Sequence, residues 1–233
     1  MFSQREIERI LEVFVYTQNL VQKDDPKYFK YINDMKAVNL PHLTKAYINI
    51  VQGFLFVWGG MGRTGIRQAI PRTQRTIQRY ADFLQSARSR KLHQVDLASD
   101  KGVIEEVFQE LHALVGPVAA AKTLHLICPE FFPLWDGYIL HGYDSSYKAK
   151  HGSLLISIGQ IPGPTGNKRV ITGTGYYNFM ELTRAFIAKY RQHLCQVQSV
   201  LNAKQPQNAQ KGLLKIVDEF NIHATHAPFY YLV

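Results

Sequence analysis

The feature that most constrains this fold is a pair of helix-forming segments joined by one tight turn. Apolar residues recur at helical spacing from Lys101 to Leu114 and again from Val118 to Ile127. Gly116-Pro117 separates the two segments, and proline breaks a helix because it lacks a backbone N–H. Small side chains at Ala119–Ala121 allow another backbone to approach the second helix closely. The sequence therefore predicts a helix, a tight turn and a second helix here.

Most of the remaining chain also has a helical pattern. Ser3 and Glu6 form a capping box for a first helix, which Pro26 is expected to end. A short polar and aromatic stretch follows, and Thr44 is then placed to cap the next helix. Helical spacing predicts four further helices, over 44–57, 73–90, 177–201 and 211–220, and a glycine-rich break over 58–65. We therefore expect a mainly α fold.

One late segment has a different character. Two runs of β-branched residues flank a Pro/Gly turn, which predicts a small inserted β-hairpin over about 152–173. With 46% apolar residues, the 233-residue chain has enough apolar surface for a substantial core. We expect residues 1–233 to form one mostly helical domain, or two helical subdomains with a cleft between them.

Composition also excludes several classes of protein. A chain with only 19% charged residues is not expected to be disordered throughout. The longest apolar run, Phe54–Trp58, is far too short to cross a membrane, and the N-terminal sequence does not resemble a signal peptide. Cys128 and Cys195 lie far apart in helix-like contexts, so we expect no disulfide framework. These features predict a cytoplasmic protein, associated with the nucleoid if the organism is prokaryotic.

Positive charge is concentrated in one segment. The formal net charge is +9, and residues 63–91 contain eight basic residues and one acid. Arginine predominates there, and its guanidinium group suits phosphate. We expect double-stranded DNA as the partner, although a solvated helix face is the alternative. The expected backbone contacts are Arg63, Arg67, Arg72, Arg75 and Arg79.

The turn at Gly116 also suggests a phosphate site. The first amides of a helix have no partner within that helix, and the helix dipole favours an anion beside them. We expect Gly116, Val118 and Ala119 to bind a backbone phosphate through these amides.

The turn and the residues after it resemble the helix-hairpin-helix motif of the DNA glycosylase superfamily. That motif has the form Leu-Pro-Gly-hydrophobic-Gly, and a proline-containing turn later presents an aspartate. Val115-Gly116 matches the last two hairpin positions, and Pro133 with Asp136 matches the later turn. The resemblance implies cleavage of the N-glycosidic bond of a flipped, damaged or modified base, with Asp136 as the catalytic residue. The alternative role of Asp136 is to cap a helix that begins near Gly137.

Some positions depart from that family's pattern. Ala113 and Leu114 stand where the family has proline and glycine, and Val118 stands where its lyases have a nucleophilic lysine. Lys122 lies one helical turn further along the same face. From that place Lys122 would reach the same cleft, and we expect it to be a second catalytic residue, a Schiff-base nucleophile, if burial lowers its pKa. A solvated or phosphate-binding lysine is the alternative.

Two other motifs have weaker interpretations. Gly60–Gly65 fits the Gly-x-Gly-x-x-Gly pattern of dinucleotide sites, but Pro71 is expected to interrupt the helix that such a site needs. We interpret these glycines instead as a flexible loop that approaches a phosphate of the DNA backbone. Lys168 and Arg169 lie at the tip of the predicted hairpin, where they would contact a DNA groove or form an exposed turn.

No cofactor or metal is expected. His223 and His226 have no third ligand nearby, and Phe132 and Trp135 are expected in the core rather than stacked on bases. The first hypothesis is therefore a DNA glycosylase, with lyase activity if Lys122 is a nucleophile. A non-catalytic nucleic-acid-binding module and a protein that binds an acidic protein partner are the alternatives.

Overall fold

A computed structural model describes residues 25–61, 64–135, 172–203 and 205–226 of the chain. Within these ranges the protein is mainly α and has no β-strand, which confirms the predicted class. The α-helices are α2 (Asp25–Lys36), α3 (Lys45–Gly53), α4 (Thr64–Arg79), α5 (Ala81–Ala87), α6 (Lys101–Val115), α7 (Pro117–Ile127), α10 (Gly173–Lys189), α11 (Arg191–Asn202) and α12 (Leu213–His226). The predicted helix after Ser3 and nearly all of the predicted hairpin at 152–173 lie outside the described residues.

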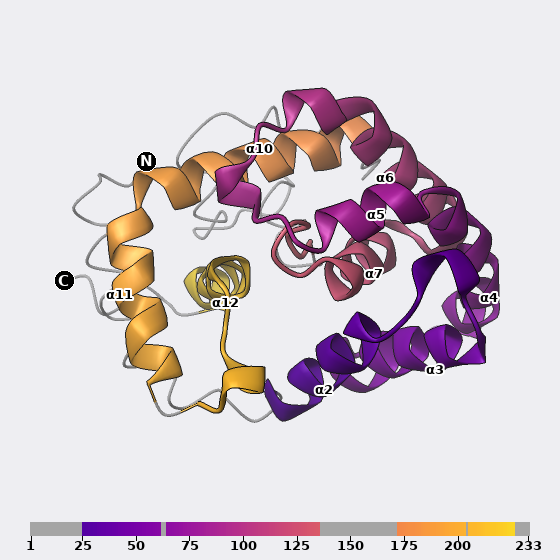
Figure 1. Cartoon of the computed structure of the whole chain (residues 1–233), viewed down its shortest axis with the longest axis horizontal. Helices are drawn as coiled ribbons and strands as arrows, with labels where there is room; N and C mark the ends of the chain where they lie inside the picture. Colours follow the sequence, from indigo (N-terminus) through magenta and orange to yellow (C-terminus); the bar gives the residue numbers. More distant parts are fainter. Residues whose placement is uncertain (1–24, 62–63, 136–171, 204, 227–233) are drawn as a thin grey trace.

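The central helix is α7. Eight of its eleven residues are buried, and the alanines of its first turns let neighbouring helices approach. A helix that is apolar all round must be covered all round. Figure 1 shows α7 inside the arc of helices formed by α2 to α6, and α2, α6 and the π-helical turn Phe54–Trp58 pack directly on it.

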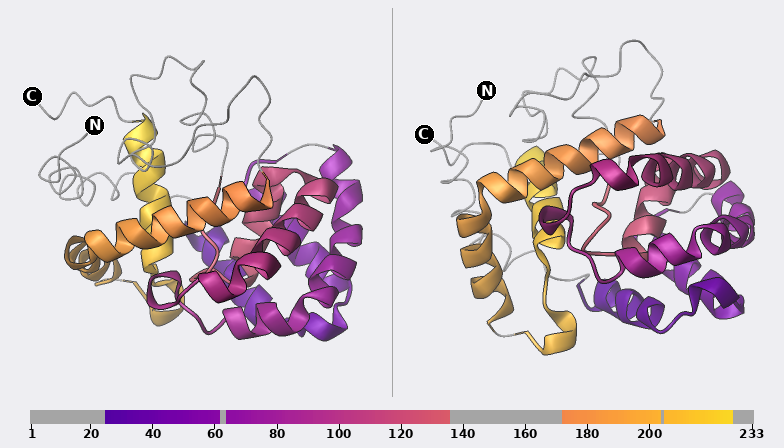
Figure 2. Two further views of the ribbon diagram at one scale, coloured as in Figure 1. Left: turned by 90° about the horizontal axis from the view of Figure 1, so that it is seen from above. Right: turned by 45° about the horizontal axis from the view of Figure 1, so that its top comes forward.

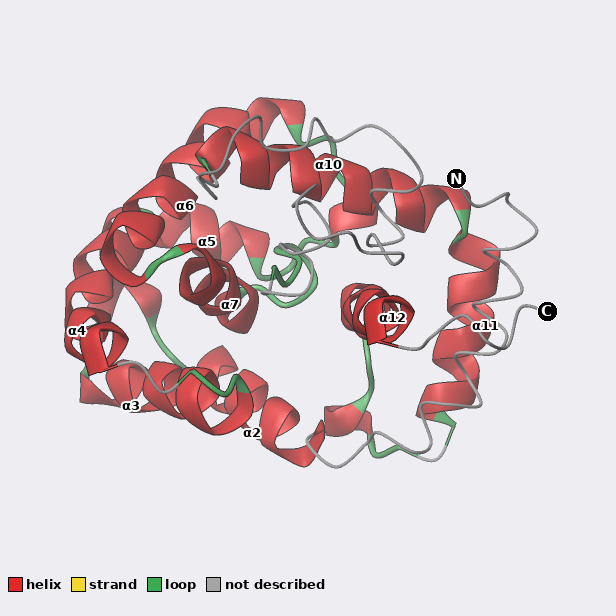
Figure 3. Ribbon diagram, turned by 180° about the vertical axis from the view of Figure 1, so that it is seen from behind, coloured by secondary structure: helices red, strands yellow, loops and turns green. Residues whose placement is uncertain are grey.

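The second half of the fold is organised by α10, which lies along α6 (Figure 2). Phe108 of α6 and Tyr176 of α10 stack with their ring centroids 4.2 Å apart. At the start of α10, Gly173 lies against the backbone of Glu105, where a side chain would clash. Helices α11 and α12 follow. Helix α11 lies at the edge opposite α4, and α12 stands between α11 and α7 (Figure 3).

One prediction about proline was wrong. Pro71 lies inside α4 rather than interrupting a helix. Because proline has no N–H, the carbonyl four residues earlier loses its helical hydrogen bond. Pro71 is exposed, so this carbonyl lies on a face of α4 where water can bond to it. Pro26 lies in the first turn of α2, where proline fits, and the helix that it was predicted to end lies outside the described residues. The polar and aromatic stretch predicted after it is helical instead. The buried residues Tyr28, Ile32 and Met35 recur at helical spacing in α2, a pattern that its polar neighbours obscure.

Tyrosines divide two of the predicted helices. The helix predicted over 73–90 is broken at Tyr80 (φ −101°, ψ 19°), and the one predicted over 177–201 is broken at Tyr190 (φ −106°, ψ 20°). Each break changes the direction of the chain so that the next helix also packs on the core. The cap predicted at Thr44 is confirmed, because its Oγ1 accepts a hydrogen bond from the Ala46 N–H.

Candidate nucleic-acid interface

One helix presents a row of arginines to solvent. Over its sixteen residues α4 has no acidic side chain, and it packs Ile70, Thr73 and Ile77 against the core. Its four arginines are all exposed and, at the α-helical angle of about 100° per residue, fall within an arc of about 140°. We call these residues the α4 arginine face: Arg67, Arg72, Arg75 and Arg79. Figure 1 shows α4 at the edge of the molecule.

Three of the four arginines have no acidic partner among the described residues. The exception is Arg79, which donates a hydrogen bond to Glu110 of α6. Arg67 lies over the Phe56 ring, 5.0 Å from its centroid, which leaves its N–H groups at the surface. Arg67, Arg72 and Arg75 form no ion pair with any carboxylate in the described part of the chain. Among the described residues, therefore, no acidic side chain compensates the positive charge of these three arginines.

Buried hydrogen bonds hold α4 in place. Thr73 donates to the Ile70 carbonyl (2.6 Å), and its hydroxyl also pairs with the Tyr47 hydroxyl of α3 (3.0 Å). Both side chains are fully buried, and burial raises the pKa of Tyr47. At the other end of the helix, Tyr80 donates to Glu110 (3.0 Å). Burial and this bond raise the pKa of Tyr80 to about 12. The arginines therefore project from a rigid helix.

The predicted turn between α6 and α7 is formed, but few of its amides are accessible. Gly116 adopts φ +81°, and its N–H donates to the His112 carbonyl (2.8 Å) and so closes α6. Ala119 is fully buried. Of the three residues expected to bind phosphate, only Val118 is suitable. It is partly exposed, and its N–H, in the first turn of α7, has no acceptor within that helix. The turn therefore offers a single amide to an anion.

Lys122 contacts the end of the π-helical turn. Its Nζ donates to the Gly59 carbonyl at 3.3 Å, and the side chain is half-buried. A carbonyl acceptor stabilises a charged ammonium group. This environment suits a lysine that acts as a cation. Because a π-helical turn rather than a strand precedes Gly60–Gly65, the dinucleotide interpretation lacks its structural context.

The chain approaches Asp136 through a buried segment. Phe132 is fully buried and Trp135 is 4% exposed, which confirms that both belong to the core. Trp135 packs against Phe179 of α10 at a ring-centroid distance of 4.8 Å. Asp136 itself lies outside the described residues, as do Arg63, Lys168 and Arg169.

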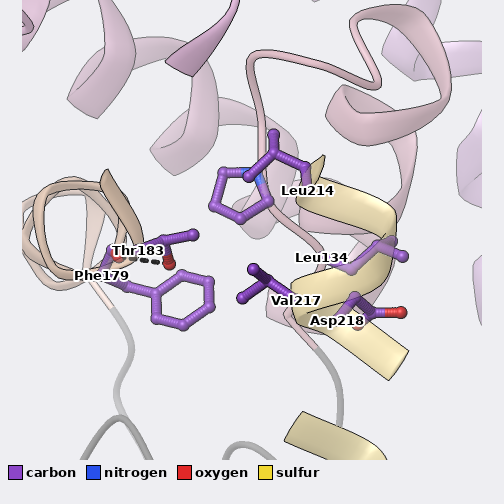
Figure 4. A pocket seen from close by; sticks show the side chains of 7 residues that line it. Leu134, Phe179, Thr183, Leu214, Val217 and Asp218 are labelled. Carbon is purple, nitrogen blue, oxygen red and sulfur yellow. Dashed lines mark hydrogen bonds between the residues drawn. The ribbon is translucent and has the colours of Figure 1, made fainter. Parts of the chain in front are cut away.

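A small hollow lies beside this segment, between α10 and α12 (Figure 4). It is too narrow to admit a water molecule, whereas ligand sites typically measure about 300–1,000 Å³, so it has no room for a base. The lining is apolar apart from two residues and consists of Pro133, Leu134, Phe179, Thr183, Leu214, Val217 and Asp218. The Thr183 hydroxyl is already bonded to the Phe179 carbonyl (2.9 Å), so the hollow offers little hydrogen-bonding capacity to a base.

Sequence analysis missed a buried ionic cluster on α12 and the turn before it. Glu219 accepts hydrogen bonds from Lys211 (2.9 and 3.0 Å) and lies 3.1 Å from Lys215, which also lies 3.7 Å from Asp218. Burial works to raise the pKa of Glu219, but Lys215 and Lys211 hold it below its usual range. The spacing of opposite charges at three and four residues was the available signal. These lysines do not contribute free charge to a surface.

Comparison of the chain with protein-family models, with curated protein sequences and with solved structures finds no match in any of the three. The described residues contain no group of three or more His, Cys, Asp or Glu side chains that could hold a metal ion. None of the helices in these ranges is both long and apolar enough to span a membrane.

Proposed function

We propose that this protein binds double-stranded DNA and excises a base from it, as a glycosylase of the helix-hairpin-helix type. The observation that supports DNA binding is the α4 arginine face, which is exposed, free of acidic residues and held rigidly. The α6–Gly116–α7 turn supports the resemblance to the glycosylase motif, because a left-handed glycine joins the two helices directly.

The dimensions of the α4 arginine face suit a nucleic-acid backbone. Arg67 and Arg79 are twelve residues apart, which is about 18 Å along a helix. Duplex DNA carries one negative charge per about 1.7 Å of its axis, so a face of this length spans several phosphates. Guanidinium groups bind phosphate with two parallel hydrogen bonds. We therefore assign Arg67, Arg72 and Arg75 to the phosphate backbone, with Arg79 available when Glu110 releases it.

The remaining roles follow the sequence resemblance. Asp136 acts at the sugar of the flipped nucleotide, and the Val118 amide binds one backbone phosphate. Lys122 serves as a phosphate contact or as the nucleophile of a lyase step. Arg63, Lys168 and Arg169 add cationic contacts to the DNA. The late hairpin remains part of the proposal as an insertion that contacts a groove.

Base release by wild type and Asp136→Asn tests this proposal. The probes are duplexes that carry a single 8-oxoguanine, uracil or 7-methylguanine, with strand scission at the abasic site as the readout. We expect wild type to release one of these bases, and Asp136→Asn to bind the same duplex but release none. Full activity in Asp136→Asn overturns the catalytic role. Trapping with borohydride distinguishes a lyase, because a Schiff base between a protein amine and the abasic sugar leaves a covalent adduct. Loss of the adduct in Lys122→Gln assigns that amine to Lys122.

A second candidate is a DNA-binding module without catalysis. The contact of Lys122 favours it, because a lysine whose ammonium group is bound to the Gly59 carbonyl is suited to act as a cation rather than as a nucleophile. This candidate predicts binding that weakens steeply with salt, with no base release from any of the three probes. The same assay therefore separates the two functions.

A further inference from the structure

Large apolar side chains reach the surface at the π-helical turn Phe54–Trp58 and just after it. The side chain of Val57 is 54% exposed, and three others nearby are only partly buried. Apolar residues scattered singly over a surface are ordinary, whereas a group of them marks a binding site. We call these residues the turn patch: Phe56, Val57, Met61 and Ile66.

Backbone contacts fix the shape of this turn. The Gly59 N–H donates to the Phe54 carbonyl at 2.8 Å, and the Met61 N–H donates to the Leu55 carbonyl at 3.0 Å. A side chain at Gly59 would clash with the Leu55 carbonyl, so the close approach requires glycine. From α7, Lys122 donates to the Gly59 carbonyl. Since π-helical turns are rare and frequently occur at functional sites, the turn itself points to a role for the patch.

Positive charge borders the turn patch on two sides. Arg67 of α4 lies over the Phe56 ring, and Lys122 of α7 lies against the end of the turn. The sequence has no Asp or Glu from residue 35 to residue 81, a range that includes α3, the turn and α4, and α7 has none either. A polyanion that approaches the patch over these elements therefore meets cations and no carboxylate of theirs.

Apolar side chains bordered by cations suit a nucleic-acid strand whose bases are accessible. In a paired duplex the faces of the bases are stacked inside, and only their edges reach the grooves. An unpaired base offers its face to an apolar side chain, while the phosphates beside it meet the cations. A fully paired duplex would therefore use Arg67 and leave the turn patch in water.

Resting on the proposed DNA binding, we infer that the turn patch binds an unpaired nucleotide of the strand that the α4 arginine face holds. The substrate class is then DNA with locally unpaired bases, such as a bulged duplex, in preference to a fully paired one. Val57 contacts the base, and Arg67 binds a phosphate beside it. This contact selects the substrate and takes no part in bond cleavage.

The test compares affinities for a fully paired duplex and for the same duplex with a short bulge of unpaired thymidines. We expect wild type to bind the bulged duplex about fivefold more tightly, because covering a half-exposed valine is worth about that factor. Val57→Ser should lose this preference and bind the paired duplex as wild type does. Val57→Phe should increase the preference, since an aromatic ring stacks on a base, and a gain of affinity does not arise from misfolding.

Val200 provides the matched control. Its side chain is 60% exposed, and it lies on α11, the helix at the edge opposite α4 (Figure 3). Val200→Ser and Val200→Phe make the same changes of apolar surface and should leave the preference at its wild-type value. The salt dependence separates the two kinds of contact. Arg67→Gln should make the slope of log K against log salt shallower by about 1 for both duplexes, whereas Val57→Ser should leave that slope unchanged.

The outcomes are distinguishable. If wild type binds the two duplexes equally, or if Val57→Ser keeps the preference or loses it only as much as Val200→Ser does, the nucleotide site is overturned and the proposed DNA binding stands. If wild type binds neither duplex, the proposed DNA binding is overturned and the nucleotide site falls with it. Base release is a separate measurement, so an inactive protein that still prefers the bulged duplex supports the nucleotide site and the module without catalysis.

Discussion

The basic side chains of α4 and those of the α12 region differ in exposure and in pairing. On α4, Arg67, Arg72 and Arg75 are exposed and lack a described acidic partner. In the α12 region, Lys211 and Lys215 are buried and paired with acids of the same segment. A count of basic residues includes both the arginines of α4 and the lysines of the α12 region. Only the arginines contribute a field that an acidic polymer can reach, so such a count overstates the surface available for binding.

The difference also separates two energetic roles for charge. An exposed arginine costs the folded state little and is available to a ligand. A buried pair has lost its hydration, and removal of one partner leaves the other charge unpaired. Substitutions on α4 should therefore change binding and leave stability intact, whereas those in the α12 cluster should change stability first.

The largest expected effect is on the stability of the α12 cluster. Glu219→Gln removes the acid that both Lys211 and Lys215 contact and leaves two buried ammonium groups short of negative charge. We expect a loss of about 3–5 kcal/mol in the free energy of unfolding, measured with denaturant at pH 7. The control is Glu181→Gln, which breaks a more exposed pair with Arg184 and should cost under about 1 kcal/mol. Equal losses in the two variants would contradict the comparison.

The second effect is on DNA affinity. Arg72→Gln with Arg75→Gln removes two charge-assisted phosphate contacts, which should weaken duplex binding by about 2 kcal/mol, or about 30-fold. The slope of log K against log salt should become shallower by about 2, because each contact releases about one counterion. Lys189→Gln with Arg191→Gln makes the same change of charge at exposed positions on the other side of the molecule. If both pairs weaken binding equally, α4 is not the interface.

The third effect is a loss of stability in acid, and it comes from His125, a buried residue of α7. His125 has a folded-state pKa of about 3, and an unfolded histidine has one of about 6.5. The unfolded chain therefore takes up a proton first, and the folded protein loses stability as pH falls below about 6.5. Between pH 7 and pH 5.5 this residue should account for a loss of about 1.3 kcal/mol, which His125→Asn should lack. If the free energy of unfolding falls equally with pH in wild type and in His125→Asn, the assignment of this loss to His125 is wrong.

Much of the fold is predictable from local sequence signals. The helices α6 and α7, the turn at Gly116 and the cap at Thr44 follow from apolar spacing, proline and hydroxyl chemistry, which act over a few residues. The breaks at Tyr80 and Tyr190 are different, because no Gly or Pro marks them and each depends on the packing of the next helix on the core. The prediction at Pro71 was wrong for a related reason. A helix tolerates an internal proline more easily on its solvent-facing side, and which side faces solvent depends on how the whole helix packs.

The candidate site was predictable in its charges and not in its contacts. The charges of the α4 arginine face follow from composition, and the helix predicted over 73–90 contains Arg75 and Arg79. Arg67 and Arg72 share the face only because α4 begins at Thr64 and continues through Pro71. The bond from the Gly116 N–H to His112, the burial of Ala119 and the contact of Lys122 with Gly59 depend on how α7 sits among its neighbours. The same holds for His125, whose two hydrogen-bond partners are 97 and 7 residues away in the chain.

The smallest effect tests the one α4 arginine that has an acidic partner. Glu110→Gln should free Arg79 to join the other three, so that duplex affinity rises by up to about 1 kcal/mol and the salt slope steepens by about 1. Glu106→Gln is the control, because it removes the same charge one turn away on α6 and contacts Tyr80 rather than Arg79. Any general gain from lost repulsion appears in both variants, so the excess in Glu110→Gln measures Arg79 alone. An equal gain in the two would mean that Arg79 does not reach the DNA, and the interface would then end at Arg75.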